Sequence, residues 1–389
     1  MNANKRLPPL DGLRALMIFI VSWYHIWQQS WLQPMIGSYS LDYLVRSGYV
    51  WVDGTVLLSA FLLFLPYARA GKEGPMPDVR EFYYRRARRI LPSYYFILLV
   101  TFFGICLPWR LYANGPYLVK DLATHFSFTF PFFYDTYVAT PLGAAAWTLA
   151  IEVQAYVLFP WVARAVVKKP AGTLAILALL CFGFRAWCLW GLTEYNMVVN
   201  QLINFLDVYV LGILGSMAFV RLEALRDRAG RRGRTALTLG ATVLLAAAVF
   251  GLTRLLQFQA SSSSVPQIQS RQMMFRPAYG LCFLGMVLGS LFSVRPIQLL
   301  LGNPVTRFLS AVSMNYYLVH QIIIVHMKRL RFPSSVSDLP NQAGEQPWQN
   351  QYTFWAFALS LALAAGITWG IEKPAARLMD RRRAKKASP

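Results

Sequence analysis

The sequence predicts an all-α, polytopic membrane protein with about ten transmembrane helices in one bundle. Of its 389 residues, 56% are hydrophobic and only 14% are charged, whereas soluble domains contain about 25% charged residues. Apolar segments long enough to cross a bilayer recur along the chain. The predicted spans are 13–32, 49–68, 91–109, 142–166, 172–192, 200–220, 235–256, 277–294, 305–327 and 352–371. Residues 1–375 are therefore predicted to form one membrane domain, and 376–389 a basic cytoplasmic tail.

The distribution of basic residues predicts the orientation of these spans. The chain has 38 Lys and Arg against 17 Asp and Glu, a net charge of +21. With the N-terminus inside, 27 basic residues fall in predicted cytoplasmic segments, nine in outer segments and two within spans. Cytoplasmic loops carry such an excess, so both termini are predicted to be cytoplasmic. The charge indicates membrane topology and attraction to anionic headgroups rather than nucleic-acid binding.

The first span contains two polar groups that lipid disfavours, Arg14 and His25. Eleven residues of helix turn through about 1100°, so both groups lie on one face, about 16 Å apart along the axis. A histidine in the outer half of a span could serve as a general base near neutral pH. The alternatives are a structural histidine and an arginine that reaches the cytoplasmic headgroups.

The second span begins at its outer end with Asp53. Antiparallel threading places this carboxylate at about the depth of His25, where it could hold the imidazole tautomer and stabilise the imidazolium. The alternative is a carboxylate favoured by the helix dipole. Ser59 lies further inward and is either a supporting polar residue or a packing residue between helices.

The inner loop 69–90 leads into the third span with the sequence EFYYRRARRILP. Its proline is predicted to occupy the first turn of that span. The arginine cluster is denser than topology requires, and guanidinium groups match phosphate oxygens, so it predicts a polyanion site. Positive-inside charge is the alternative. The cluster contains Arg85, Arg86, Arg88 and Arg89.

The outer loop 110–140 contains HFSFTFPFFYDTY. These aromatic residues indicate either an interfacial belt or a lid whose rings stack on a sugar.

Later spans contain further ionisable residues. Glu152 lies in mid-span without a Lys or Arg nearby in sequence, so it should be protonated or paired with a group on another helix. His320 in the ninth span is either a supporting residue or a structural polar contact, and His326 is expected at the interface. The four cysteines lack metal-ligand spacing, so neither a metal site nor a permanently bound cofactor is expected.

Six segments, in order, resemble the acyltransferase-3 family of integral membrane acyltransferases. They read LDGLRALMIFIVSWYHIW, DGTVLLSAFLLF, FYYRRARRILP, WTLAIEVQAYVLFP, SMNYYLVH and IEKP. The first keeps the family's spacing between arginine and histidine. The chain departs from the usual residues at three positions: Ala60 stands for glycine, Thr148 for serine and Met314 for tyrosine.

This resemblance implies a multi-pass cell-membrane O-acyltransferase that uses cytosolic acyl-CoA, with acetyl-CoA the expected donor. The acceptor would be a hydroxyl of an extracytoplasmic or lipid-linked glycan. The implied catalytic residues are His25, Asp53 and Glu152; the acyl-CoA-binding residues are Arg14, Arg85, Arg86 and Arg89; and the supporting residues are Ser59, Trp147 and His320. A transporter or flippase that uses the polar face as a pathway is the main alternative, and a receptor-like binding protein is another.

Overall fold

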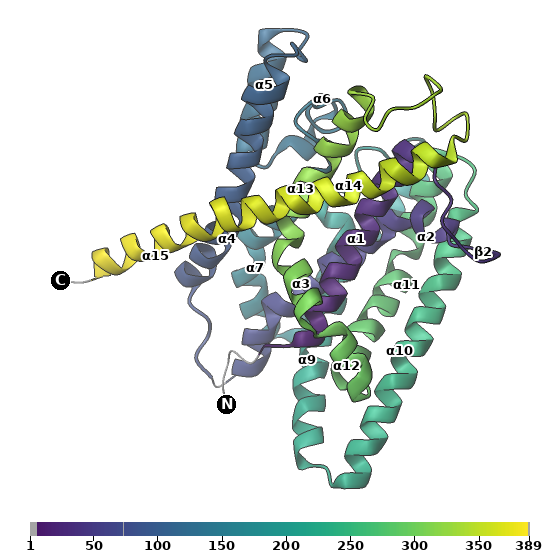
Figure 1. Cartoon of the computed structure of the whole chain (residues 1–389). Coiled ribbons are helices and arrows are strands. Elements are labelled where there is room, and N and C mark those ends of the chain that lie inside the picture. The colour runs from purple at the N-terminus through teal and green to yellow at the C-terminus, as the bar shows by residue number, and fades with distance from the viewer. Residues whose placement is uncertain (1–5, 73, 388–389) are drawn as a thin grey trace. The chain divides into compact units, whose positions relative to one another are not determined.

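The computed structural model describes residues 6–72 and 74–387 and is almost entirely helical (Figure 1). Within these residues, nine helices are long and apolar enough to cross a membrane. The prediction of an all-α, multi-pass membrane protein is confirmed. The long helices are α1 (Pro8–Ser30), α3 (Trp51–Ala70), α4 (Val79–Thr101), α7 (Trp147–Lys168), α8 (Pro170–Gly191), α9 (Leu206–Arg228), α10 (Arg231–Ala260), α11 (Val265–Phe292), α13 (Pro304–Arg329) and α14 (Gln346–Ile367).

Short elements connect the long helices. The short α-helices are α2 (Asp42–Arg46), α5 (Gly115–Phe126), α6 (Tyr134–Tyr137), α12 (Arg295–Leu301) and the terminal α15 (Lys373–Ala387). The strands β1 (Met35–Ile36) and β2 (Tyr39–Ser40) form an antiparallel pair. The 3₁₀ turns are η1 (Gly48–Val50), η3 (Phe130–Phe132), η4 (Ala144–Ala146) and η5 (Leu202–Phe205), and the π-helical turns are η2 (Phe102–Cys106) and η6 (Thr368–Glu372).

Helix α1 corresponds to the first predicted span but is not among the nine apolar helices. Its 23 residues are enough to cross a membrane. Asp11, Arg14 and His25 lower its hydropathy. Both Arg14 and His25 are residues of this helix.

The start of α4 differs from the prediction. The helix begins at Val79, and Pro92 lies inside it rather than in its first turn. Asp78 caps this start, because its carboxylate accepts the N–H of Glu81 at 2.7 Å, and an acidic cap followed three residues later by Glu favours helix initiation. The arginine cluster therefore lies on a regular helix and not in a loop.

The helices group into two compact units. The first unit contains the described residues of Met1–Tyr24, together with Met35–Pro77 and Val157–Ser310. In it, α3 packs along α9, and α10 along α11. The approach of α3 to α9 requires Gly212, since a Cβ there would lie 2.6 Å from the carbonyl oxygen of Leu57.

The second unit contains His25–Pro34, Asp78–Tyr156 and the described residues of Ala311–Pro389. Part of its core joins the end of α1 to α13 and α14, through Ile26, Ile324 and Tyr352. Helix α14 continues through η6 into α15 (Figure 1). The predicted basic tail is therefore helical as far as Ala387, and it lies against α4.

Candidate active site

Two histidines lie together in the second unit. The rings of His25, near the end of α1, and His320, in α13, are 5.2 Å apart between centroids and tilted by 45°. His320 is fully buried, and His25 is partly exposed. The ring of His320 is also parallel to that of Tyr316, at 6.1 Å. The supporting position predicted for His320 is thus next to the predicted base.

The hydrogen bonds of the two rings define their chemistry. Nδ1 of His25 lies 3.0 Å from Oε1 of Gln28, and Nδ1 of His320 lies 2.6 Å from the carbonyl oxygen of Tyr317. A backbone carbonyl oxygen can only accept, so Nδ1 of His320 carries a proton. Between His25 and Gln28, the donor depends on the histidine tautomer and on the orientation of the amide. Nε2 of His320 has no hydrogen-bond partner among the residues that the structure describes. The two imidazole rings thus lie side by side, and the Nδ1 atom of each is hydrogen-bonded.

Glu152 lies on α7 beside the arginine cluster of α4. Its Oε2 accepts the hydroxyl of Tyr156 at 2.8 Å. The guanidinium of Arg86 lies over the ring of Tyr156, at 5.7 Å from its centroid, and interacts electrostatically with Glu152. The expectation of a basic partner on another helix agrees with this arrangement, in which α4 supplies Arg86.

The arginines of the cluster differ in their partners. Arg85 is exposed and donates to Glu81 at 2.5 Å, and Arg88 pairs with Asp380 of α15. Arg86 and Arg89 form no ion pair with any residue that the structure describes. The guanidinium groups of Arg86 and Arg89 are therefore the ones most available to an anionic ligand.

A second polar cluster adjoins Arg89. Nδ2 of Asn315, in α13, donates to Oε2 of Glu372 at 2.7 Å and to the hydroxyl of Thr368 at 2.8 Å. Arg89 interacts electrostatically with Glu372. These contacts connect the segment SMNYYLVH to the segment IEKP and to the arginine cluster.

Asp53 belongs to the first unit and has an ion-pair partner there. Its Oδ1 lies 3.3 Å from Nε of Arg276 in α11, and both side chains are fully buried. Nearby, Arg185 of α8 pairs with Asp207 of α9 at 3.0 Å, and both Arg185 and Arg276 donate to the carbonyl oxygen of Asn204. Two buried carboxylates and two buried guanidiniums thus balance in charge. The role predicted for Asp53 beside His25 stays a prediction.

The remaining predicted residues are placed as follows. Arg14 and Ser59 are half-buried in the first unit, and Trp147 is half-buried at the start of α7. Gly12, in the segment around Arg14, meets the backbone of α12, since a Cβ there would lie 2.3 Å from the carbonyl oxygen of Leu301. The neighbouring Asp11 accepts hydrogen bonds from Arg6 and Ser310. Within the described residues, no three His, Cys, Asp or Glu side chains are placed to hold a metal ion.

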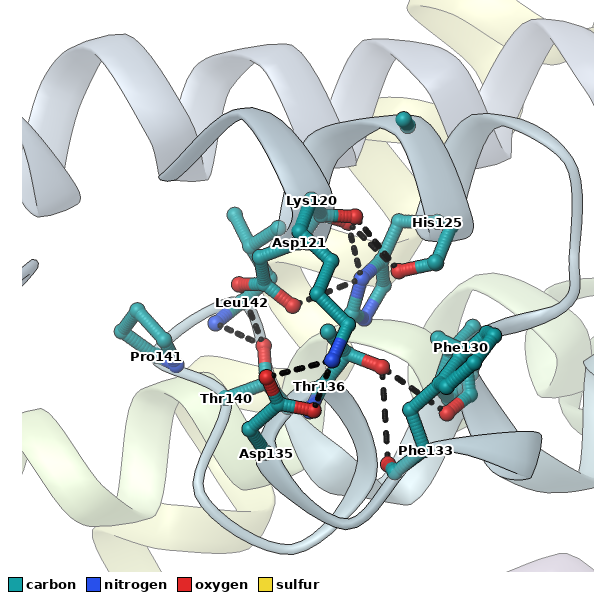
Figure 2. Close-up of polar contacts among 12 residues, drawn as sticks. Lys120, Asp121, His125, Phe130, Phe133, Asp135, Thr136, Thr140, Pro141 and Leu142 are labelled. Carbon is teal, nitrogen blue, oxygen red and sulfur yellow. Dashed lines mark hydrogen bonds and ion pairs between the residues drawn. The ribbon is translucent and has the colours of Figure 1, made fainter. Parts of the chain in front are cut away.

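The predicted outer loop contains a buried acid and a buried histidine that the sequence did not single out. Asp121 and His125, one turn apart in α5, are both inaccessible to solvent (Figure 2). Nδ1 of His125 lies 3.1 Å from Oδ1 of Asp121, and its ring stacks on Phe130 at 4.1 Å. The loop's exposed aromatic residues are Phe126, Phe132, Phe133 and Tyr134.

A family model described as acyltransferase domain matches residues 8–373. The chain belongs to this acyltransferase family. The match includes five of the six segments quoted above in full, the first three residues of IEKP and every predicted site residue, so the resemblance is confirmed over almost the whole chain. Each of those residues keeps its individual role as a prediction.

Curated relatives of this acyltransferase-family chain include several O-acetyltransferases. It is 27% identical over 186 residues to a putative peptidoglycan O-acetyltransferase of Bacillus subtilis, covering 46% of the chain and 27% of the relative. It is 31% identical over 203 residues to an O-acetyltransferase of Staphylococcus aureus, covering 47% and 30%. It is 27% identical over 168 residues to a peptidoglycan O-acetyltransferase of Listeria monocytogenes, covering 41% and 24%. The matched part is thus less than a third of each relative's length. No solved structure matches the chain.

The sequence analysis missed several partners of the site residues. Gln28 was detectable, because residues three apart lie on one helix face. Arg276 and Asn315 come from segments far along the chain, so no local signal could connect them to the site.

Proposed function

We propose that this protein is a membrane O-acyltransferase that transfers an acetyl group from acetyl-CoA to a hydroxyl of a peptidoglycan-type glycan. The observation that carries the proposal is the pair of His25 and His320: two adjacent imidazole rings whose Nδ1 atoms are hydrogen-bonded, with the ring of His25 partly exposed. The names of the relatives support the acetyl group and the acceptor class. The family supports acyl transfer.

His25 is the general base in this proposal. Its Nε2 takes the proton of the acceptor hydroxyl as the hydroxyl oxygen attacks the thioester carbonyl. The tetrahedral intermediate collapses, the carbon–sulfur bond breaks, and the CoA sulfur leaves as a thiolate that recovers the proton from the imidazolium. The products are the O-acetyl ester and free CoA, so atoms and charge balance without a further reactant.

His320 and Gln28 support the base. By accepting a hydrogen bond from Nδ1 of His25, Gln28 would fix the tautomer in which Nε2 can accept a proton. The ring of His320, held by the carbonyl of Tyr317, packs against His25 and limits its rotation. A base with a fixed orientation needs less reorganisation on the way to the transition state.

The arginines of α4 bind the donor in this proposal. Arg86 and Arg89 would donate charge-assisted hydrogen bonds to the phosphates of CoA. Glu152 would then fix the guanidinium of Arg86 from the neighbouring helix α7.

The test is an acceptor-dependent assay with purified full-length protein. Acetyl-CoA labelled in its acetyl group is supplied with soluble peptidoglycan fragments, and both CoA release and label on the glycan are measured. We expect CoA release only with acceptor, and an ester that mild alkali removes. Movement of glycan or CoA across vesicles without ester formation would instead support a transporter and overturn the proposal.

A further inference from the structure

The buried carboxylate of Asp121 is the centre of a set of contacts that acyl transfer does not use directly. Its Oδ2 accepts the hydroxyls of Tyr112 and Thr140, each at 2.9 Å, and its Oδ1 lies 3.1 Å from Nδ1 of His125 (Figure 2). Burial and the neighbouring Asp121 raise the pKa of Tyr112, so this phenol remains a donor. The hydroxyls of Tyr112 and Thr140 thus satisfy Oδ2. Nδ1 of His125 donates to the backbone carbonyl oxygen of Asp121 at 2.8 Å, and Oδ1 accepts no hydrogen bond from the described residues. Because a buried carboxylate is costly, these few contacts hold its position.

Other helices of the second unit hold the same loop. The hydroxyl of Tyr94, in α4, donates to the carbonyl oxygen of His125 at 3.0 Å. Nε2 of Gln154, in α7, donates to the carbonyl oxygen of Phe128 at 3.1 Å. Phe128 has a positive φ of 58°, an uncommon conformation for a residue with a side chain. The loop around Asp121 is therefore fixed in position and not a loose connection.

The contacts continue from Thr140 to α13. Oγ1 of Thr140 accepts the N–H of Leu142 at 3.1 Å. Three residues further, the N–H of Ala145 donates to Oε1 of Gln321, and the carbonyl oxygen of Ala145 accepts the hydroxyl of Tyr317 at 2.6 Å. The carbonyl of Tyr317 in turn holds Nδ1 of His320. Within the second unit, hydrogen bonds and one short segment of chain connect Asp121 to the histidine pair.

We propose that Asp121 is a positioning residue for the histidine pair. By holding Thr140 it fixes the segment 140–145, and that segment fixes α13 at Tyr317 and Gln321. The orientation of His320 beside His25 then depends on a carboxylate in a different part of the unit. This inference rests on the proposed function for its catalytic consequence. Asp121 itself contacts no group of the histidine pair.

The kinetic test compares Asp121→Asn and Thr140→Val with Asp135→Asn. Asp135 is an exposed acid of the same loop whose carboxylate pairs with Lys120 at 2.7 Å, so it is the matched control. A misplacement of about 1 Å costs about 100-fold in rate. We expect kcat to fall about 10- to 100-fold in the first two variants while the KM for acetyl-CoA changes less than about twofold. A rise in KM with unchanged kcat would overturn the proposal.

A double-variant cycle tests the route of the effect. If Asp121 acts through the bond between Ala145 and Tyr317, the two substitutions disrupt the same route. The double variant Asp121→Asn, Tyr317→Phe should then have a kcat only slightly below that of the single variants. If the fold-loss in kcat of the double variant equals the product of the two single fold-losses, Asp121 does not act through this bond, and the proposed route is wrong. Thr140→Val removes one hydroxyl and keeps the side-chain shape, so it provides the same test if Asp121→Asn does not fold.

A crosslink provides a readout that does not depend on turnover. Cysteines at Ala145 and Gln321 are oxidised, and the disulfide is quantified by mass spectrometry, with and without Asp121→Asn. We expect crosslinking to fall several-fold in the Asp121→Asn background, and equal crosslinking would overturn the positioning role. Crosslinking of the Ala145→Cys and Gln321→Cys chain with Asp121 intact, together with no acetyl transfer by the wild-type protein, would count against the proposed function alone.

Discussion

At the scale of single residues, side chains of one type have different surroundings and therefore different expected roles. His25 and His320 face each other, whereas His326, further along α13, bonds its own helix at Ile322 and lies against Trp109. We expect His25→Ala to lower turnover by about 10²- to 10⁴-fold, the contribution of a general base. His326→Gln is the matched control and should transfer at the wild-type rate. Near-normal turnover by folded His25→Ala protein would remove this residue from the mechanism.

The arginines of α4 allow a second comparison of like residues. Arg86 and Arg89 form no ion pair among the described residues, whereas Arg85 is bonded to Glu81. We expect Arg86→Gln and Arg89→Gln each to weaken acetyl-CoA binding by about 1.5–3 kcal/mol, the contribution of a hydrogen bond to a charged group. Arg85→Gln should have a smaller effect. Titration with acetyl-CoA measures all three, and equal affinities would favour a topological role for the whole cluster.

The predicted site residues could be found from the sequence because polar groups within apolar spans are conspicuous. Most of their interaction partners could not be found in this way, because they lie in distant segments of the chain. The carboxylate of Asp53 pairs with Arg276, which lies in the chain more than two hundred residues later, and the role predicted for Asp53 beside His25 stays a prediction. Asp121 and His125 were not predicted as site residues, because they lie in a polar, aromatic loop. An acid and a histidine are common in such a loop, and the sequence does not show that these two are buried.

At the scale of helices, α4 and α7 join the arginine cluster to Glu152. We expect Glu152→Gln to keep the shape of the side chain, retain the contact with Tyr156 and remove the charge beside Arg86. If the charge matters, both thermal stability and acetyl-CoA affinity should fall, because the half-buried guanidinium of Arg86 loses its favourable electrostatic interaction with Glu152. Stable protein without turnover would instead indicate proton transfer by Glu152. Thermal unfolding and donor titration of one preparation separate these outcomes.

The ten predicted spans each correspond to a helix, because apolar length is a strong local signal. The helix ends were harder to predict, since caps rather than hydropathy decide them. The prediction placed the start of the third span near Pro92, but the side chain of Asp78 starts α4 at Val79. Interior proline costs one hydrogen bond, which the long apolar remainder of α4 tolerates.

At the scale of the whole molecule, the buried charges of the first unit connect α3, α8, α9 and α11. We expect Arg276→Leu to lower stability by about 3–5 kcal/mol, because it leaves Asp53 buried without its partner. Adding Asp53→Leu should recover most of that loss, since an apolar pair of similar volume often replaces a buried ion pair without cost. Thermal unfolding of the full chain in detergent measures both variants. A double variant no more stable than Arg276→Leu would contradict this account.

The division into two units could not be predicted, because neither unit is continuous in sequence. Hydropathy identifies each span but gives no information about which spans pack together. The residues that join distant segments, such as Asn315 with Glu372 and Tyr317 with Ala145, are polar residues with no local pattern.

The discontinuity of the second unit has a consequence for biogenesis. Asp78–Tyr156 precedes Ala311–Pro389 by about 150 residues, and translation at about 5–20 residues per second makes that interval about 8–30 s. During this time the nascent chain contains α4, the predicted outer loop 110–140 with Asp121, and the start of α7, but not α13. Glu152 and Arg86 are both synthesised early and can stabilise each other. The carbonyl oxygen of Ala145, however, lacks its hydrogen-bond donor until Tyr317 has been synthesised. A ribosome-arrested chain that ends near residue 300 should therefore be cut by protease in the segment 140–145, and one arrested after residue 387 should be protected there.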